Sequence, residues 1–221
     1  KYLYGGYSTI SLGYIGIYEM TKLMKGVSHT DPVGREFAFR VMNYMNAKCR
    51  QWKEETGLGF ALYGTPAESL CYRFARIDQE RFGTIEDITD KGYYTNSYHV
   101  DVREEIDAFT KFKFESDFQK ISSGGSISYV EVPNMKALED VVKFIYENIL
   151  YAEFNTKSDY CQECGFDGEI LINDDNEWEC PNCGNKDQNK MNVTRRTCGY
   201  LGENFWNVGK TKEIKSRVLH L

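Results

Sequence analysis

The stretches Cys161-Gln-Glu-Cys164-Gly165 and Cys180-Pro-Asn-Cys183-Gly184 decide the fold of the C-terminal quarter of this 221-residue chain. A C-x-x-C turn brings two thiolates toward one ion, and the following glycine permits the positive φ angle that turns backbone amides toward sulfur. Two such turns complete a tetrahedral set of four sulfur ligands. The spacing therefore predicts a structural zinc site on Cys161, Cys164, Cys180 and Cys183. Rubredoxin-like iron and a redox dithiol pair are the alternatives, since the same geometry suits iron.

The segment between the two turns completes a small zinc ribbon over residues 157–190. Residues 169–179 read as two short strands around an Asp-Asp-Asn turn, which sets the cysteine turns side by side. This window holds nine acidic residues against three lysines, a charge of -6 that equals the net charge of the whole chain. Such a surface repels phosphates. We therefore expect a structural clip and no nucleic-acid partner.

The composition describes an acidic globular protein. Hydrophobic residues make up 41% and charged residues 27% of the chain, enough to bury a core, which excludes intrinsic disorder. No apolar run reaches the ~20 residues of a membrane span, and no secretory signal is present, so we expect no membrane partner and a cytoplasmic, reducing location.

Cys49 and Cys71 lie in helical patterns and read as core residues. The start at Lys1, inside an apolar segment, suggests a piece of a longer protein.

Strands and helices alternate upstream of the ribbon. We expect a strand turning into a helix over 8–25, a buried strand at 59–64, an extended segment at 94–100 and a strand at 126–132. Helices are expected from Asp31-Pro32 to Gly57, between 104 and 120, and after an Asn134 cap, with an apolar face that includes Val142 and Leu150. Alternation of this kind predicts an α/β fold with a largely parallel sheet, open or closed into a barrel.

Two polar stretches are candidate binding residues. Thr65, Pro66 and Glu68 fit the cap, first and third positions of a helix that starts directly after the 59–64 strand. Such a helix start can bind an anion, although a well-capped helix with no ligand is the simpler interpretation. Asn96, Ser97 and His99 cluster at what reads as a strand end, where α/β folds place ligands.

The segment Arg196-Thr-Cys-Gly199-Tyr200 resembles the glycyl radical signature, an arginine three residues before a glycine that is followed by tyrosine. A glycine has no Cβ, so an α-carbon radical there can be planar with its flanking amides. Together with the four-cysteine ribbon, this signature resembles the class III anaerobic ribonucleoside-triphosphate reductases. Three further stretches look like the same family, so the resemblance covers nearly all of the chain: Gly-Thr-Pro-Ala-Glu-Ser, Thr-Asn-Ser-Tyr-His-Val and Ser-Ser-Gly-Gly-x-Ile-x-Tyr-Val-Glu.

The resemblance implies a fold and a chemistry. Residues 1–156 would form the second half of a ten-stranded glycyl radical enzyme α/β barrel, 157–190 the zinc ribbon, and 191–221 the radical loop and tail. Gly199 would store a radical generated by a partner that uses S-adenosylmethionine and a [4Fe-4S] cluster. The radical would pass to a cysteine thiol outside this sequence, which abstracts the ribose 3'-hydrogen of a ribonucleoside triphosphate.

The resemblance also implies partners and a substrate site. The chain would need the remainder of the large subunit, would be inactive alone and incomplete as a barrel, and would form a homodimer. Substrate phosphates would lie at Thr65, Ala67, Glu68 and Ser69, and Asn96, Ser97 and His99 would line the same cavity. The alternatives are another glycyl radical enzyme or a spare radical-cofactor domain, and a non-enzymatic zinc-ribbon interaction module.

Overall fold

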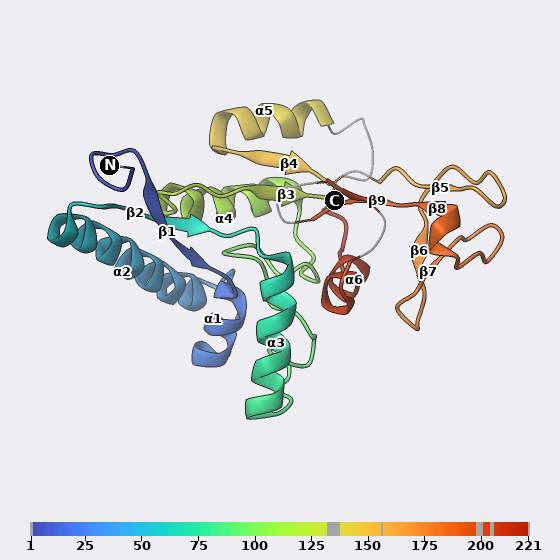
Figure 1. Cartoon of the computed structure of the whole chain (residues 1–221), viewed down its shortest axis with the longest axis horizontal. Coiled ribbons are helices and arrows are strands. Elements are labelled where there is room, and N and C mark those ends of the chain that lie inside the picture. Colours follow the sequence, from blue (N-terminus) through green and yellow to red (C-terminus); the bar gives the residue numbers. More distant parts are fainter. Residues whose placement is uncertain (1, 132–137, 156, 198–200, 204–205, 221) are drawn as a thin grey trace.

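The computed structural model describes residues 2–131, 138–155, 157–197, 201–203 and 206–220. It is elongated, with the N-terminus toward one end and the cysteine ribbon at the other (Figure 1). Parallel strands β1 (Thr9–Tyr14) and β2 (Gly59–Gly64) lie near the N-terminal end. Two helices, α1 (Ile17–Lys25) and α2 (Pro32–Thr56), connect them. The predicted strands and helices of residues 8–64 are confirmed.

Helix α2 has the ends that the sequence predicts. The Asp31 side chain accepts a hydrogen bond from the backbone N–H of Val33 at 2.9 Å, and Pro32 occupies the first turn, where it costs no hydrogen bond. Gly57 ends the helix with φ 70°, a conformation that glycine adopts without strain. The inner face of α2 packs on the strands through Ala38, Met42 and Cys49, which are all buried.

A second parallel pair repeats this strand–helix–strand arrangement. Strands β3 (Ser128–Val130) and β4 (Ala152–Phe154) pair in parallel and are connected by α5 (Leu138–Asn148), while α4 (Ala108–Ile121) precedes β3. The predicted 126–132 strand is thus shorter than expected, and the Asn134 cap lies outside the described residues. Val142 and Leu150 are 47% and 75% exposed. The predicted apolar face also includes Val141 and Ile149, and these two are buried in the core. The face is therefore narrower than predicted, and Leu150 lies beyond the end of α5.

Backbone hydrogen bonds join the two strand pairs. Gly124 N–H donates to the Leu62 carbonyl at 2.7 Å, and Gly64 N–H donates to the Gly125 carbonyl at 3.0 Å. Gly64 is required by this approach, because a Cβ there would lie 2.7 Å from the Ser126 Cβ. Two successive parallel pairs with helical connections confirm an α/β architecture. The described residues contain no closed barrel, so the half-barrel stays a prediction.

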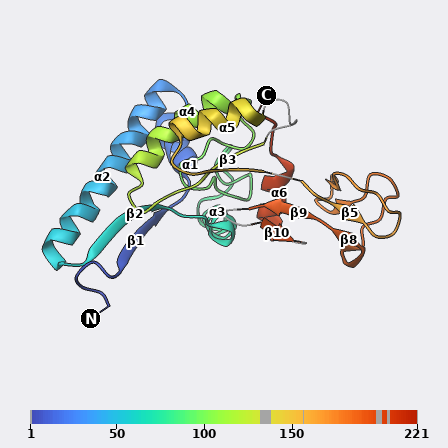
Figure 2. The same ribbon diagram turned by 90° about the horizontal axis from the view of Figure 1, so that it is seen from above.

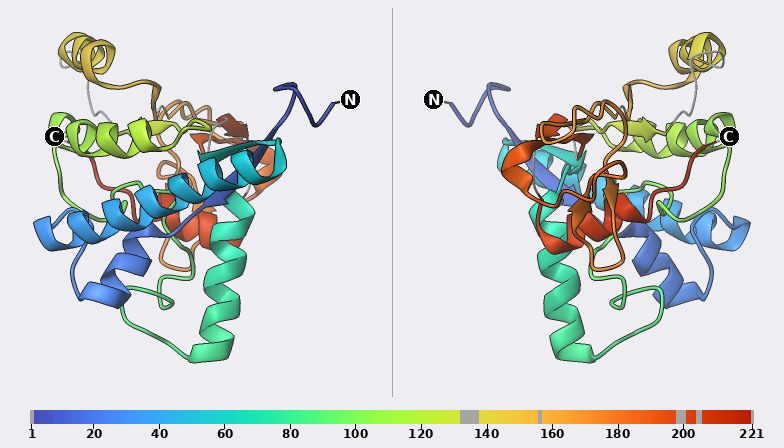
Figure 3. Two further views of the ribbon diagram at one scale, coloured as in Figure 1. Left: turned by 90° about the vertical axis from the view of Figure 1, so that its left-hand side faces the viewer. Right: turned by 90° about the vertical axis from the view of Figure 1, so that its right-hand side faces the viewer.

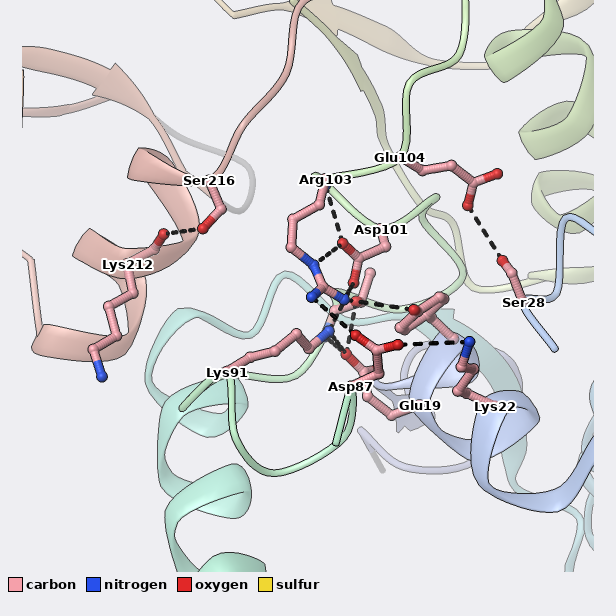
Figure 4. Close-up of polar contacts among 12 residues, drawn as sticks. Glu19, Lys22, Ser28, Asp87, Lys91, Asp101, Arg103, Glu104, Lys212 and Ser216 are labelled. Atoms are coloured by element: carbon pink, nitrogen blue, oxygen red, sulfur yellow. Dashed lines mark hydrogen bonds and ion pairs between the residues drawn. The ribbon is translucent and has the colours of Figure 1, made fainter. Parts of the chain in front are cut away.

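The chain between α3 (Glu68–Phe82) and α4 is a long loop held by buried charges. Lys91 Nζ lies 2.6 Å from Glu19 Oε1 and 2.7 Å from Asp101 Oδ2, with all three side chains at most 4% exposed. Arg103 pairs with Asp101 at 2.8 Å and with Asp87 at 3.1 Å (Figure 4). The expected extended segment at 94–100 forms no strand. It turns at Ser97 and Tyr98, and its Thr95 and Ser97 carbonyls accept hydrogen bonds from the backbone N–H groups of Gly16 and Ile17 at the start of α1.

The C-terminal part consists of short antiparallel pairs. Strands β6 (Leu171–Ile172) and β7 (Trp178–Glu179) form the predicted hairpin, and β5 (Tyr160–Cys161) pairs with β8 (Met191–Asn192) after the 3-10 helix η1 (Gln188–Lys190). Strand β9 (Thr194–Arg196) pairs with β10 (Leu201–Glu203), and α6 (Val208–Lys215) follows. Figure 2 shows the ribbon projecting beyond α6.

The ribbon has a small core of its own that includes α6. Cys161, Ile170, Trp178, Met191 and Val193 are buried together with Ile214 of α6, and Trp206 packs on them. This contact agrees with the predicted role of a structural clip. The end views show α3 extending away from the remaining elements (Figure 3). Among the residues that the structure describes, no helix has the length and apolar character needed to cross a membrane.

Candidate functional site

The first candidate cavity lies where β2 ends. Its wall includes Thr65, Pro66, Asn96 and His99, together with Ser126 from the loop before β3, and we call it the Thr65 cavity. The structure therefore brings Thr65, Asn96 and His99 together, as the sequence predicts. Ser97 lies beside them but is buried, and Ala67 and Ser69 do not line this cavity.

Helix α3 starts later than the sequence predicts. It begins at Glu68 with Ala67 at its cap position, and the cap makes no side-chain hydrogen bond. The Thr65 hydroxyl donates instead to the Tyr63 carbonyl at 3.3 Å. The predicted capping box of Thr65 and Glu68 is therefore wrong, because Thr65 lies too far before the first turn to cap it. The Glu68 side chain lies outside the described part of the structure.

Asn96 replaces the missing cap. Its Oδ1 accepts a hydrogen bond from the Ala67 N–H at 3.3 Å and lies 3.2 Å from the Cys71 Sγ. An amide from a distant loop thus ties down the start of α3. The amides of a first helical turn have no acceptor within their helix. The start of α3 therefore still presents N–H groups near Thr65, although its geometry differs from a capping box.

His99 is buried and held from both sides. Its Nδ1 lies 3.0 Å from Ser97 Oγ and 2.8 Å from the Asn96 carbonyl, and its Nε2 lies 2.7 Å from the Ile127 carbonyl. The ring stacks between Tyr98 and Tyr129. Burial lowers the pKa of His99. A neutral ring can donate to only one of the two carbonyls; when Nε2–H donates to Ile127, Nδ1 can accept from the Ser97 hydroxyl and also faces the Asn96 carbonyl.

Ser97 has an unusual backbone. Its φ is 36°, a left-handed conformation that costs free energy for any residue with a side chain. The side chain is fully buried and faces His99. A strained serine that orients a buried histidine is typical of a functional site. The sequence identifies both residues from their polarity, but not this strain.

A second cavity shares a wall with the first. We call it the Thr197 cavity: Asn96, His99 and Tyr129 line both, and Thr197 and Arg217 border only the second. Around it lie charged side chains that the sequence does not assign to a site. These are Lys111, Glu131, Lys210, Glu213, Arg217 and His220.

Charge pairing dominates the Thr197 cavity. Lys210 Nζ lies 2.7 Å from Glu213 Oε2, and Arg217 Nε lies 3.0 Å from Glu213 Oε1. Burial raises the pKa of Glu213, but Arg217 and Lys210 outweigh it and hold the pKa at about 2. His220 lies next to the chain end, yet it is buried and accepts a hydrogen bond from Glu131 N–H at 2.9 Å. No sequence motif marks these residues, because the fold alone brings them together.

The four cysteines form a cluster that fits a metal ion. Their sulfur atoms all lie within 4.8 Å of one another. Cys161 and Cys183 are 3.8 Å apart and Cys164 and Cys180 are 3.7 Å apart, Sγ to Sγ. A tetrahedral ion with bonds of about 2.3 Å to sulfur separates its ligands by about 3.8 Å. Gly165 and Gly184 have φ 73° and 71°, as the motif predicts.

Local hydrogen bonds favour the thiolate form of Cys161 and Cys164, whereas the neighbouring thiols raise the pKa of Cys183. Burial raises the pKa of Cys161, but the backbone amides of Cys164 and Glu163 and the Asn185 side chain lower it to about 6. The surrounding acidic residues are partly neutralised by exposed pairs, Lys190 with Glu163 at 2.6 Å and Lys186 with Glu177 at 3.1 Å. The cluster can therefore hold a metal ion in a surface that remains acidic.

The consecutive arginines Arg195 and Arg196 face opposite ways, and Arg196 is the first residue of the predicted glycyl radical motif. Arg195 is buried, pairs with Asp159 and donates to the Ile170 carbonyl at 3.0 Å within the ribbon. Arg196 pairs with Glu153 of β4. Successive side chains of a β-strand point to opposite faces, and the two arginines follow this pattern. Gly199, Cys198 and Tyr200 lie outside the described residues, so the assignment of Gly199 remains a prediction.

Comparison with known proteins decides the family. The model of the family described as anaerobic ribonucleoside-triphosphate reductase matches residues 1–220. The chain belongs to this family. Curated members include those of Haemophilus influenzae, 45% identical over 98% of this chain, and of Enterobacteria phage T4, 46% identical over 97%. The matches cover 32% and 35% of those relatives, so the chain spans about a third of their length.

Solved structures of anaerobic ribonucleotide reductases share the fold. One covers 98% of this chain and 34% of its own with a TM-score of 0.72 at 24% identity. The Thermotoga maritima enzyme, solved with glycerol in its active site, covers 96% of this chain and 32% of its own with a TM-score of 0.67 at 23% identity. Family membership confirms the resemblance read from the sequence and disfavours a stand-alone zinc-ribbon module.

Proposed function

We propose that this chain is the C-terminal part of an anaerobic ribonucleotide reductase that converts ribonucleoside triphosphates to deoxyribonucleoside triphosphates, with its stored radical on Gly199. The observation that carries the proposal is the shared wall of the two cavities. Asn96 and His99 connect the Thr65 cavity with the cavity that Thr197, two residues before Gly199, borders. The radical would supply the oxidising equivalent that starts hydrogen abstraction from the ribose.

The Thr65 cavity would hold the substrate. Its roughly 290 Å³ exceed the 60 Å³ of the Thr197 cavity. Substrate phosphates would bind beside Thr65 at the nearby start of α3, on the first-turn amides of Glu68 and Ser69, aided by the helix dipole. Ala67, whose amide already donates to Asn96 Oδ1, would border the phosphates without donating to them. Asn96 would fix the helix start, while Ser97 would hold His99 in the wall as a neutral hydrogen-bonding group.

The four-cysteine cluster would bind structural zinc. All four sulfurs are committed to one tetrahedral set, which leaves no position for a substrate. The ribbon core joins this cluster to Ile214 of α6 and Trp206, which follow the radical motif in sequence. Zinc would therefore stabilise the frame around the radical-bearing segment rather than take part in the reaction.

The proposal implies partners that act on the complete protein. An activating enzyme with S-adenosylmethionine and a [4Fe-4S] cluster would generate the radical. The rest of the large subunit would supply the remaining barrel strands and the cysteine that receives the radical, and the complete subunit would form a homodimer. The Thermotoga maritima relative has been solved in complex with dATP and CTP, so that relative binds nucleotides.

Anaerobic activation of the complete protein tests this function. We expect an organic radical EPR signal split by one α-hydrogen, absent in Gly199→Ala, together with reduction of a ribonucleoside triphosphate. Deuteration of glycine should collapse the splitting. A radical signal that persists in Gly199→Ala would refute the assignment of Gly199. A glycyl radical without nucleotide binding or reduction would favour another glycyl radical enzyme.

A further inference from the structure

Two carboxylates lie at the ends of the paired strands β3 and β4. Glu131 directly follows β3, and Glu153 lies within β4 opposite Tyr129. Their side chains are 5% and 18% exposed. A buried carboxylate is costly unless it is paired. Each of the two is paired with an arginine that comes from the C-terminal part of the chain.

Arg217 connects three elements through one guanidinium. It lies 3.2 Å from Glu131 Oε1 and donates to both carboxylate oxygens of Glu213 in α6, at 3.0 and 3.2 Å. It also donates to the backbone carbonyl of Arg196 at 3.0 Å. Only arginine has the planar set of five N–H donors that reaches all of these acceptors.

Arg196 is therefore held twice. Its side chain pairs with Glu153, and its carbonyl accepts from Arg217, so both barrel carboxylates act on one residue. The next residue, Thr197, is buried and borders the Thr197 cavity. The backbone enters the radical motif from a point that is fixed to the ends of two neighbouring strands.

The C-terminal segment that carries Arg217 is itself tied to the barrel part. Val218 N–H donates to the Val102 carbonyl at 2.9 Å, and His220 N–H donates to the Glu131 carbonyl at 3.0 Å. Glu131 N–H donates in return to His220 Nδ1 at 2.9 Å. These hydrogen bonds hold the backbone on either side of Glu131 and just after Arg217.

We propose that Arg217, held by Glu131, is a positioning residue for radical transfer: it fixes the Arg196 carbonyl, and with it Thr197 at the border of the Thr197 cavity that Asn96 and His99 also line. Glu153 has the same role toward the Arg196 side chain. This inference rests on the proposed radical on Gly199. It gives these buried ion pairs a role in turnover as well as in stability.

Variants of the complete reductase, activated anaerobically, separate positioning from radical storage. Arg217→Gln, Arg217→Lys and Glu131→Gln are compared with Arg35→Gln, which removes an arginine that pairs with Asp117 between α2 and α4 and does not line the Thr197 cavity. The EPR signal gives the radical content per chain, and initial rates with a ribonucleoside triphosphate give kcat and KM. Dividing kcat by radical content gives turnover per radical.

We expect turnover per radical to fall about 10- to 100-fold in Arg217→Gln and Glu131→Gln, because a misplacement near ~1 Å costs rates of that order. Radical content and KM should stay within about twofold. Arg217→Lys should not restore turnover, since one ammonium cannot reach all the acceptors. Arg35→Gln should lower the melting temperature only slightly and leave turnover per radical unchanged.

Unchanged turnover per radical in Arg217→Lys and Glu131→Gln would overturn the inference, and so would a loss confined to KM. If Arg217→Gln does not fold, the other two variants decide. A parent enzyme that forms no radical would instead refute the proposed function, so the two failures are distinguishable.

Discussion

The barrel part and the ribbon are stabilised in opposite ways. In the barrel part, six-residue strands β1 and β2 are covered by a 25-residue helix, and buried apolar side chains hold the layers together. The ribbon has two-residue strands, few apolar residues and four converging thiols. Segments this small cannot bury enough surface to fold alone. We therefore expect the ribbon to depend on a metal ion and on the buried Arg195–Asp159 pair, whereas residues 2–155, the part predicted to belong to a barrel, should not.

Removal of one cysteine should give the largest effect, because metal binding supplies most of the folding free energy of such a ribbon. Cys180→Ser should reduce the zinc content from about one equivalent to less than about half. Amide hydrogen exchange should become fast in residues 157–190 and stay slow in β1 and β2. Cys49→Ser, in the barrel core, is the control and should keep its zinc. Slow exchange in a zinc-free ribbon would contradict the comparison.

The next effect concerns the buried pair of Asp159 and Arg195. Asp159 also accepts hydrogen bonds from the backbone N–H groups of Ile170 at 2.8 Å and Thr194 at 3.1 Å. Asp159→Asn should destabilise the ribbon by about 3–5 kcal/mol, since it leaves a buried guanidinium without its charge partner. Asp117→Asn breaks the more exposed Arg35 pair and should cost at most about 1 kcal/mol. Hydrogen exchange measures the difference, read in the ribbon for Asp159→Asn and in α2 and α4 for Asp117→Asn; equal effects would contradict it.

The barrel core should show its own pH dependence through His29. Its side chain is fully buried against Phe114 and Phe118, and burial lowers its pKa from 6.5 to about 4. The unfolded state therefore binds a proton more readily, so stability is lost as the pH falls from about 6.5 to 4. At a pH of about 5 the loss should be about 2 kcal/mol. His29→Gln should lack this slope in urea unfolding; parallel pH curves for parent and variant would refute the assignment.

The smallest effect is expected at the start of α2. Asp31→Ala removes the side-chain acceptor for Val33 N–H and should cost about 1 kcal/mol in urea unfolding. Lys190→Gln, in an exposed ribbon pair, should stay within about 0.5 kcal/mol. A cap variant as harmless as the Lys190 variant would show that α2 is held by packing alone.

Local patterns explain what the sequence can predict. The cysteine turns, the Asp31 cap and the strand at 59–64 each involve contacts within a few residues, so their geometry follows from spacing. Thr65, Asn96 and His99 are identified by polarity and do share a cavity. The sequence misplaces the start of α3 because its cap comes from Asn96, 29 residues away.

The Thr197 cavity could not be predicted for the same reason. Arg217 and Glu131 form a hydrogen bond although they are 86 residues apart in the sequence, and His220 and Glu131 do so at a separation of 89 residues. Neither pair follows a local period or a motif. Burial of the Lys91 cluster also depends on segments that meet only in the folded chain. Such sites become visible only when the fold has placed both partners.

The central claim is that Gly199 stores a radical, and exposure to air tests it most directly. Glycyl radicals react with oxygen by breaking the chain at the radical-bearing residue. Mass spectrometry of the complete protein, activated and then aerated, should show loss of the C-terminal peptide that begins near Tyr200. Gly199→Ala and unactivated protein should remain intact. An activated, EPR-positive protein that stays intact in air, or is cut elsewhere, would contradict the claim.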